Sequence, residues 1–302
     1  MKDLDVFVIG GVGVDTIVRV PALPLPMKDS ILVPPIEDFV GHTGNGVALG
    51  CHALGLRTEI ADVIGEDDRG RLIQRTYDAA GLAHTFHVHK SGTRRSVNLV
   101  DNMGRRVALY DPRHPADMEV DPKLYKTGIN RTRHVHVSIM NWARQALAVA
   151  VKAGQPTSTD LHDWNGVNAY HRDFAYEADI VFMSTAALGD HADDVALDIL
   201  RRGRAHVVVA MAGADGCRLT ARGQLTRAVP AIRLPDLPVV DSNGAGDSFV
   251  AAFLYAHLKG QSWGNAVLAG MVAGAFACGS AGTHTSFIDR NRLQTELDRQ
   301  SI

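Results

Sequence analysis

Apolar runs alternate along this chain with segments whose apolar residues recur at helical spacing. The run at 6–10 is wholly apolar and ends in glycine, which is typical of a buried strand in a parallel sheet. Further strands are predicted at 59–65, 134–139, 180–184 and 206–213, helices at 44–54, 67–81, 142–153, 191–202 and 289–300, and a hairpin at 216–228. This order predicts an α/β fold in which helices cover both faces of a parallel sheet.

A second pattern interrupts this alternation. Between 86 and 110, apolar and polar residues alternate with a period of two, which is typical of strands with one exposed face. Short strand-like runs also occur at 16–20 and 30–35, with three prolines between them. These segments form a β-rich insertion in the chain, and no linker is long enough to separate a second domain.

The composition is that of an ordinary globular enzyme, with 46% hydrophobic and 21% charged residues. The formal net charge of −2 gives no general attraction to nucleic acid or to an anionic membrane. The three cysteines lie far apart, which predicts free thiols and fits the reducing cytoplasm. The apolar stretch 266–282 is rich in Ala and Gly, so we expect a buried helix there rather than a membrane span.

The stretch "DSNGAGDSF" at 241–249 places an acid where a glycine-rich turn meets a helix. Glycine allows backbone N–H groups to converge, and the start of a helix attracts anions. The turn could therefore form an anion hole, with Asp247 as a base that takes the proton of an aligned hydroxyl. Asp247 could equally be a residue that only caps the helix. The stretch alone does not separate these two interpretations.

Other phosphate and metal motifs are absent or incomplete. The stretch "GGVGVD" at 10–15 lacks the third glycine and the following helix of a dinucleotide fingerprint. No Gly-Lys pair occurs, which excludes the P-loop. Histidine pairs at 87–89 and 134–136 lack a clear third ligand, so a zinc site is not predicted.

The stretch at 241–249 closely resembles the C-terminal signature of the PfkB, or ribokinase-like, carbohydrate kinases, D-[ST]-x-G-A-G-D-x-F. Four further stretches resemble family motifs, in the same order and along nearly the whole chain: "GGVGVD", "VGHTGNGVALGCHALG", "VIGEDDRGRLI" and "VVVAMAGADGC". The resemblance implies one ribokinase-like domain over 1–302, with a small β-sheet lid formed by inserted segments near 14–40 and 86–112. It also implies an ATP-dependent kinase that phosphorylates a hydroxyl of a sugar or sugar-like small molecule, with Mg²⁺ bridging the phosphates.

The resemblance further assigns roles within the signature. Asp247 would be the general base, and the anion hole would consist of the N–H groups of the turn that precedes it, formed by Gly244, Ala245 and Gly246. Asp241 and Asn243 would hold a monovalent cation such as K⁺, or Asp241 would only brace the turn.

Residues outside the signature receive roles as well. The resemblance implies that Asp15, Gly41 and Asn45 contact the sugar. Arg113, at the end of the lid segment, either reaches substrate or phosphate or is a solvated loop residue. The nucleotide would lie along a glycine-rich loop and the signature turn, at Gly213, Asp215, Gly216 and Gly244.

Two departures from the family pattern bear on function. Val40 stands where the first glycine of a Gly-Gly pair is usual, and "STAA" at 184–187 replaces an N-x-x-E motif linked to Mg²⁺. A catalytically weak binding protein is therefore one alternative, and a nucleoside kinase is another. The intact G-A-G-D turn favours catalysis, because a protein that only binds its ligand needs no base. The exposed lid sheet could pair with a second copy, so a homodimer is expected.

Overall fold

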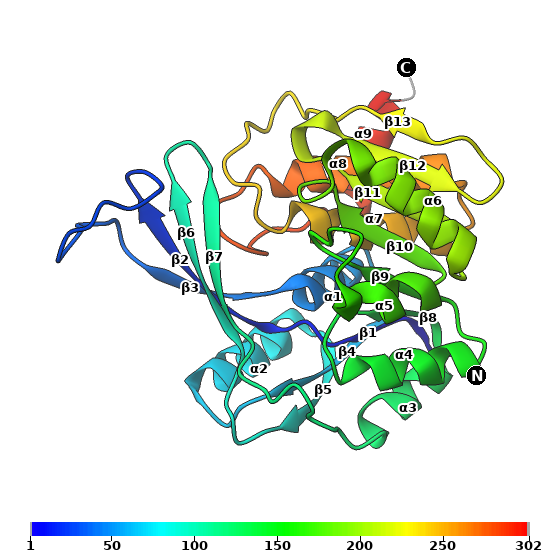
Figure 1. The fold of residues 1–302 in the computed structure, drawn as a ribbon, viewed down its shortest axis with the longest axis horizontal. Helices are drawn as coiled ribbons and strands as arrows, with labels where there is room; N and C mark the ends of the chain where they lie inside the picture. The colour runs from blue at the N-terminus through cyan, green and yellow to red at the C-terminus, as the bar shows by residue number, and fades with distance from the viewer. Residues whose placement is uncertain (1, 301–302) are drawn as a thin grey trace.

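The computed structural model describes residues 2–300, and its strands form two sheets of different size (Figure 1). The strands of the larger sheet are β1 (Leu4–Ile9), β4 (Thr58–Ile64), β5 (Ala83–Val88), β8 (Thr132–Val137), β9 (Thr157–Asp160), β10 (Ile180–Ser184), β11 (Val207–Met211), β12 (Cys217–Ala221) and β13 (Arg227–Val229). Within the described residues these nine strands have the order β13-β12-β11-β10-β9-β8-β1-β4-β5. The strands from β11 to β5 pair in parallel, whereas β12 and β13 form the predicted antiparallel hairpin.

Helices cover both faces of this sheet, as predicted. One face carries α1 (Thr43–Ala53), α2 (Asp68–Ala80), α7 (Ala245–Leu258), α8 (Trp263–Ala277) and α9 (Arg290–Gln300). The other carries α3 (Lys123–Arg131), α4 (Ala143–Lys152), α5 (Arg172–Glu177) and α6 (Ala192–Arg202). In β1, Val6 and Val8 pack into the first core, and Phe7 and Ile9 pack into the second. Successive side chains of a strand point to opposite faces, which is why a buried parallel strand is apolar throughout.

Local signals place the ends of several helices. Asp67 accepts a hydrogen bond from the Gly70 N–H at 2.8 Å and caps α2, which ends at Gly81 with φ +68°. Ser262 caps α8 in the same way.

Most of α8 is buried against α7, as expected for the Ala- and Gly-rich stretch. No helix among residues 2–300 is long and apolar enough to cross a membrane.

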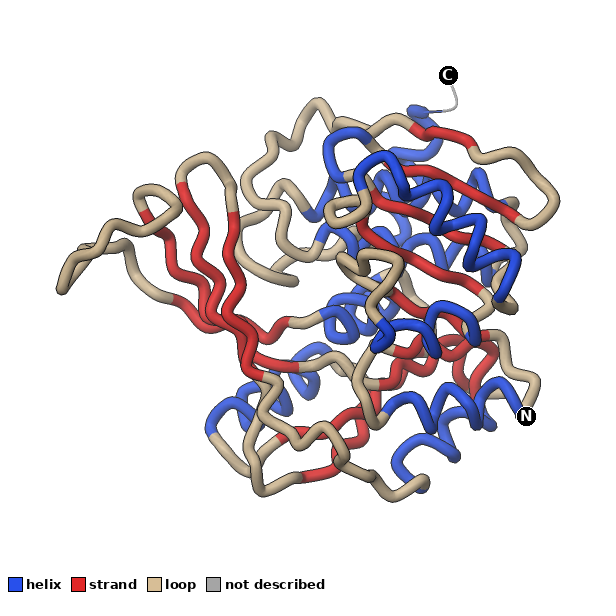
Figure 2. Tube along the Cα trace, viewed as in Figure 1, coloured by secondary structure: helices blue, strands red, loops and turns tan. Residues whose placement is uncertain are grey.

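A smaller sheet stands to one side of this body (Figure 2). Within the described residues it has four strands, in the order β3 (Glu37–Gly41), β2 (Gly13–Val20), β6 (Arg95–Asp101) and β7 (Arg106–Asp111). We call this sheet the lid. The strand predicted at 30–35 is wrong, because that segment is irregular and the strand lies later, at 37–41. The alternating run near 86 belongs instead to β5, which pairs with β4 in the larger sheet.

A buried ion pair fixes the base of the lid to the body. Arg94, next to the start of β6, contacts the Asp62 carboxylate of β4 at 2.5 Å, and both side chains are almost fully buried. The same carboxylate accepts the Val12 N–H at 2.7 Å, just before β2. Two lid strands therefore leave the body from one shared anchor.

Candidate active site

The signature turn leads directly into α7, as the sequence predicts. Gly244 adopts the left-handed conformation with φ +78° at the N-cap, and Asp247 is the third residue of the helix. The N–H groups in the first turn of a helix have no acceptor within it, so this end can receive an anion. Gly246 faces Met211 at the end of β11, which places the turn beside the carboxyl end of the large sheet.

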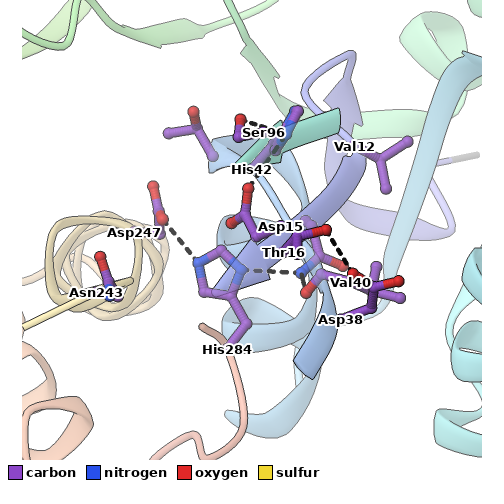
Figure 3. A network of polar contacts seen from close by, with 12 residues as sticks. Val12, Asp15, Thr16, Asp38, Val40, His42, Ser96, Asn243, Asp247 and His284 are labelled. Atoms are coloured by element: carbon purple, nitrogen blue, oxygen red, sulfur yellow. Dashed lines mark hydrogen bonds and ion pairs between the residues drawn. The ribbon is translucent and has the colours of Figure 1, made fainter. Parts of the chain in front are cut away.

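Asp247 is paired with a histidine that the motif does not reveal. Asp247 Oδ2 lies 2.7 Å from His284 Nε2, and the His284 side chain is only 1% exposed (Figure 3). On the other side of the ring, Asn45 Nδ2 lies 2.9 Å from His284 Nδ1 and 3.1 Å from the Val40 carbonyl oxygen. A carbonyl oxygen can only accept, so the Asn45 amide donates to it and to Nδ1. His284 therefore accepts through Nδ1 and donates its Nε2 proton to Asp247.

Glycines make room for this Asp–His pair. A Cβ on Gly46 would lie 2.5 Å from Asp247 Cβ, and a Cβ on Gly244 would lie 2.6 Å from His284 Cδ2. Both distances are far below van der Waals contact, so any larger residue would displace the pair. His284 itself has φ +56°, which is uncommon for a residue with a side chain. Backbone strain of this kind is concentrated at functional sites.

Asp15, on the lid strand β2, forms a second Asp–His pair. Asp15 Oδ1 lies 3.4 Å from His42 Nε2, which also lies 3.2 Å from Ser96 Oγ on β6. Gly41 allows the close approach, because a Cβ there would lie 2.7 Å from Asp15 Cγ. His42 has φ +70° and ψ 158°, a region that glycine almost alone adopts. Figure 3 shows Asp15 and Asp247 directed toward the same space, from the lid and from α7.

Charge keeps the Asp15 carboxylate ionised. Burial by itself raises the pKa of Asp15, but other interactions, led by the hydrogen bond and charge of His42, outweigh it. The pKa of Asp15 is therefore lower than its usual value, so the group is an acceptor at neutral pH. An ionised carboxylate can orient sugar hydroxyls by accepting their hydrogen bonds.

Two arginines of the lid reach the start of the signature. Arg19 Nη2 on β2 lies 2.6 Å from Asp241 Oδ2, and Arg106 Nη1 on β7 donates to Asn243 Oδ1. Asp241 and Asn243, which were expected to hold a monovalent cation, thus each accept a hydrogen bond from an arginine. Positively charged guanidinium groups at these oxygens do not fit a bound cation.

The expected nucleotide loop lies next to the signature turn. The β11 strand ends at Met211 beside Gly246, and the short 3-10 helix η3 (Gly213–Asp215) follows. Gly213 and Asp215 are exposed, whereas Gly216, with φ +94°, is buried against the Val229 carbonyl. The Thr185 N–H of the "STAA" stretch donates to the Met211 carbonyl at 2.9 Å. Three loops from separate parts of the chain therefore meet here.

Other candidate residues lie at differing distances from this centre. Arg113 pairs with Asp111 at 2.5 Å and lines a pocket of about 550 Å³ along the edge strand β7. Burial raises the pKa of Asp160 at the end of β9; the His162 charge opposes this shift and the Asp247 charge adds to it. His162 Nε2 lies 3.2 Å from Thr43 Oγ1 at the start of α1. The loop after β9 therefore borders the active site, and Arg113 lies farther out, on the lid.

In the described part of the chain, no metal centre is built from side chains alone. Within residues 2–300, no group of three or more His, Cys, Asp or Glu side chains could hold a metal ion. Mg²⁺ is commonly held by one or two carboxylates together with the phosphates of a substrate.

The sequence reasoning overlooked His284 and His42. His42 stands inside a quoted family motif, directly after Gly41, so its polar side chain was a usable signal. His284 is 37 residues from Asp247, in an irregular segment after α8, and carries no local pattern. Only the three-dimensional structure brings it to Asp247.

Comparisons with known proteins identify the family of this chain. The pfkB family carbohydrate kinase profile matches residues 4–290. The acarbose 7(IV)-phosphotransferase of Actinoplanes sp. is 42% identical over 290 residues, covering 96% of this chain and 97% of that protein. The solved structure of the microbiome-derived acarbose kinase Mak1 is 60% identical with a TM-score of 0.93, covering 98% of this chain and 99% of that one.

A more distant structure supports the fold alone. Ribokinase from Giardia lamblia superimposes with a TM-score of 0.83 at 15% identity, covering 98% of this chain and 99% of that one. A sugar kinase relative that spans nearly the whole chain favours a kinase over a binding protein, and a sugar over a nucleoside acceptor. The chain belongs to the PfkB family of carbohydrate kinases, and it is an ATP-dependent sugar kinase with a ribokinase-like fold.

Proposed function

We propose that this kinase phosphorylates a hydroxyl of acarbose or of a closely related oligosaccharide. One observation carries the proposal: 60% identity with an acarbose kinase, extending over 98% of this chain. The 42% identity with an acarbose phosphotransferase points to the same acceptor.

In this proposal Asp247 is the general base. One of its oxygens accepts the His284 proton, which leaves the other to receive the proton of the acceptor hydroxyl. The hydroxyl oxygen attacks the terminal phosphorus, the bond to the bridging oxygen of ADP breaks, and the proton passes to Asp247. The N–H groups of Gly244, Ala245 and Gly246 stabilise the charge that develops on the transferred phosphoryl group.

The acceptor and the nucleotide approach from opposite sides. Asp15, beside Gly41, orients the sugar hydroxyls from the lid. Asn45 is fully buried and donates to Val40 and His284, so it positions His284 rather than contacting the sugar. The nucleotide lies along the loop at 213–216 and the Gly244 turn. Mg²⁺ bound with the nucleotide would neutralise charge on the phosphates.

The proposed function includes a homodimer that forms through the lid and a cytoplasmic location. The face of the lid that points away from Asp247 exposes Val107 and Leu109, at 45% and 57%, on the edge strand β7. Such a face suits pairing with a second lid, so we expect a homodimer. Use of ATP and three unpaired cysteines suit the cytoplasm.

The test is ATP consumption by the purified protein with acarbose, maltotriose, fructose, ribose and a nucleoside as separate acceptors. We expect the largest kcat/KM with acarbose and its loss in Asp247→Asn. Full activity of Asp247→Asn would refute the role of the base. A higher kcat/KM with a monosaccharide would refute the acceptor while leaving the kinase assignment intact.

A further inference from the structure

The inner face of the lid carries two arginines that contact the signature loop. Arg19 and Arg106 lie on different strands, β2 and β7, and both point to the side on which Asp15 lies. Their partners, Asp241 and Asn243, are two residues apart in the loop that ends at the anion hole. The lid therefore touches the catalytic turn through charged groups that the kinase mechanism does not use.

The Asp241 carboxylate is fully engaged in these contacts. Its Oδ2 accepts from Arg19 Nη2 at 2.6 Å and, more weakly, from the Gly282 N–H at 3.4 Å. Its Oδ1 accepts from the Asn243 N–H at 3.0 Å. The residue is only 7% exposed, and a carboxylate with so little water contact needs a compensating positive charge. Arg19 supplies this charge.

We propose that Arg19 takes the place of a monovalent cation at the signature loop, and that Arg19 and Arg106 position the anion hole when the lid is closed. A guanidinium is always charged and fills the position with a directed hydrogen bond, which a K⁺ ion cannot provide. The Gly244 turn begins one residue after Asn243, so fixing the loop also fixes the N–H groups of the hole. Both arginines are positioning residues, because neither touches the reacting atoms.

In this proposal, the anion hole is complete only when the lid is closed. Arg19 leaves Asp241 when the lid opens, and the loop then loses its compensating charge. An open enzyme would hold ATP beside an incomplete anion hole, which limits transfer of the phosphoryl group to water. Closure over the acceptor brings Asp15 and Arg19 to the site together, since both lie on β2.

The first test compares rates in K⁺, Na⁺ and tetramethylammonium chloride at equal ionic strength. We expect wild-type rates to agree within about twofold, and Arg19→Met to be about tenfold slower and to be stimulated by K⁺. Arg105→Met is the matched control, because Arg105 lies on the same lid but pairs with Asp101. Stimulation of the wild type by K⁺ of about tenfold or more would overturn the proposal. A slow Arg19→Met enzyme that ignores K⁺ would also overturn the claim that the guanidinium replaces a cation.

A second measurement needs no acceptor, so it stands even if the proposed sugar is wrong. Amide hydrogen exchange over residues 240–248 should be faster in Arg19→Met than in the wild type, and unchanged in Arg105→Met. Added K⁺ should slow exchange in Arg19→Met only. Equal exchange in the wild type and Arg19→Met, or protection of the wild-type loop by K⁺, would refute the proposal.

Discussion

The site contains two Asp–His pairs that differ in how firmly the histidine is held. His284 donates to Asp247 at 2.7 Å and is fixed from behind by Asn45. His42 lies 3.4 Å from Asp15 and also faces a serine hydroxyl, so its proton has two possible acceptors. We interpret this difference as one fixed carboxylate, Asp247, and one adjustable carboxylate, Asp15.

The two pairs also belong to different parts of the molecule. Asp247 is on α7, within the main hydrophobic core, and Asp15 is on a lid strand. A base must meet one hydroxyl in one geometry, since small displacements reduce the rate strongly. A group that orients a ligand can instead adapt to the position of that ligand. Fixed and adjustable carboxylates therefore suit catalysis and binding, respectively.

The largest effect is expected for Asp247→Asn. The amide cannot accept the hydroxyl proton as a base does, so kcat should fall by about a thousandfold while KM changes little. Steady-state kinetics with the best acceptor measures this, and Asp236→Asn, on an exposed ion pair with Arg292, is the control. A raised KM for the acceptor with an unchanged kcat would contradict this assignment of Asp247.

The fixed histidine is tested by His284→Leu and His284→Gln. Loss of a hydrogen bond to a charged group costs about 1.5–3 kcal/mol, so kcat for the leucine variant should fall roughly 10- to 100-fold. Glutamine retains an N–H for Asp247 and should recover part of this rate. Equal rates for the two variants would show that packing alone matters at this position. Their melting temperatures, measured in parallel, separate loss of fold from loss of rate.

The adjustable pair should affect binding more than turnover. Asp15→Asn keeps the shape but loses the charge, so KM for the acceptor should rise about tenfold, with a smaller change in kcat. Kinetics across a range of acceptor concentrations gives both constants. A large loss of kcat at unchanged KM would assign Asp15 to the chemical step and remove the distinction between the pairs.

The sequence predicts the scaffold of this site because its signals are local. The apolar run of β1 and the glycine-rich entry to α7 depend only on neighbouring residues, and both elements lie where they were expected. The lid was harder to delimit, because β5 and the lid strands share the same alternating pattern. Only pairing with β4 assigns β5 to the large sheet.

Contacts distant in sequence could not be predicted from it. Arg19 and Asp241 are 222 residues apart, and no periodicity links them. An arginine on an exposed strand is most often solvated, so its type alone suggests nothing about a partner. The fold brings such residues together, and here they connect the lid to the catalytic turn.

The smallest predicted effect concerns the pH dependence of Asp15. Its pKa lies below the ordinary value of 3.8 in the folded protein, so the ionised form stabilises the fold above 3.8, and this stability is lost as pH falls through the folded pKa. Burial alone would raise the pKa, and His42 opposes that effect. In His42→Gly the carboxylate should therefore protonate at higher pH. Glycine also suits the φ of +70° at this position, so the fold should survive the substitution.

The measurement is kcat/KM from about pH 7 down to about pH 4, because this ratio reports the free enzyme. Relative to the wild type, His42→Gly should lose kcat/KM progressively over the lower half of this range. The ratio of the two enzymes removes effects that are common to both, such as protonation of ATP. If the two profiles run parallel, His42 does not control the charge of Asp15. The proposed contrast between the two Asp–His pairs would then lose its electrostatic basis at Asp15.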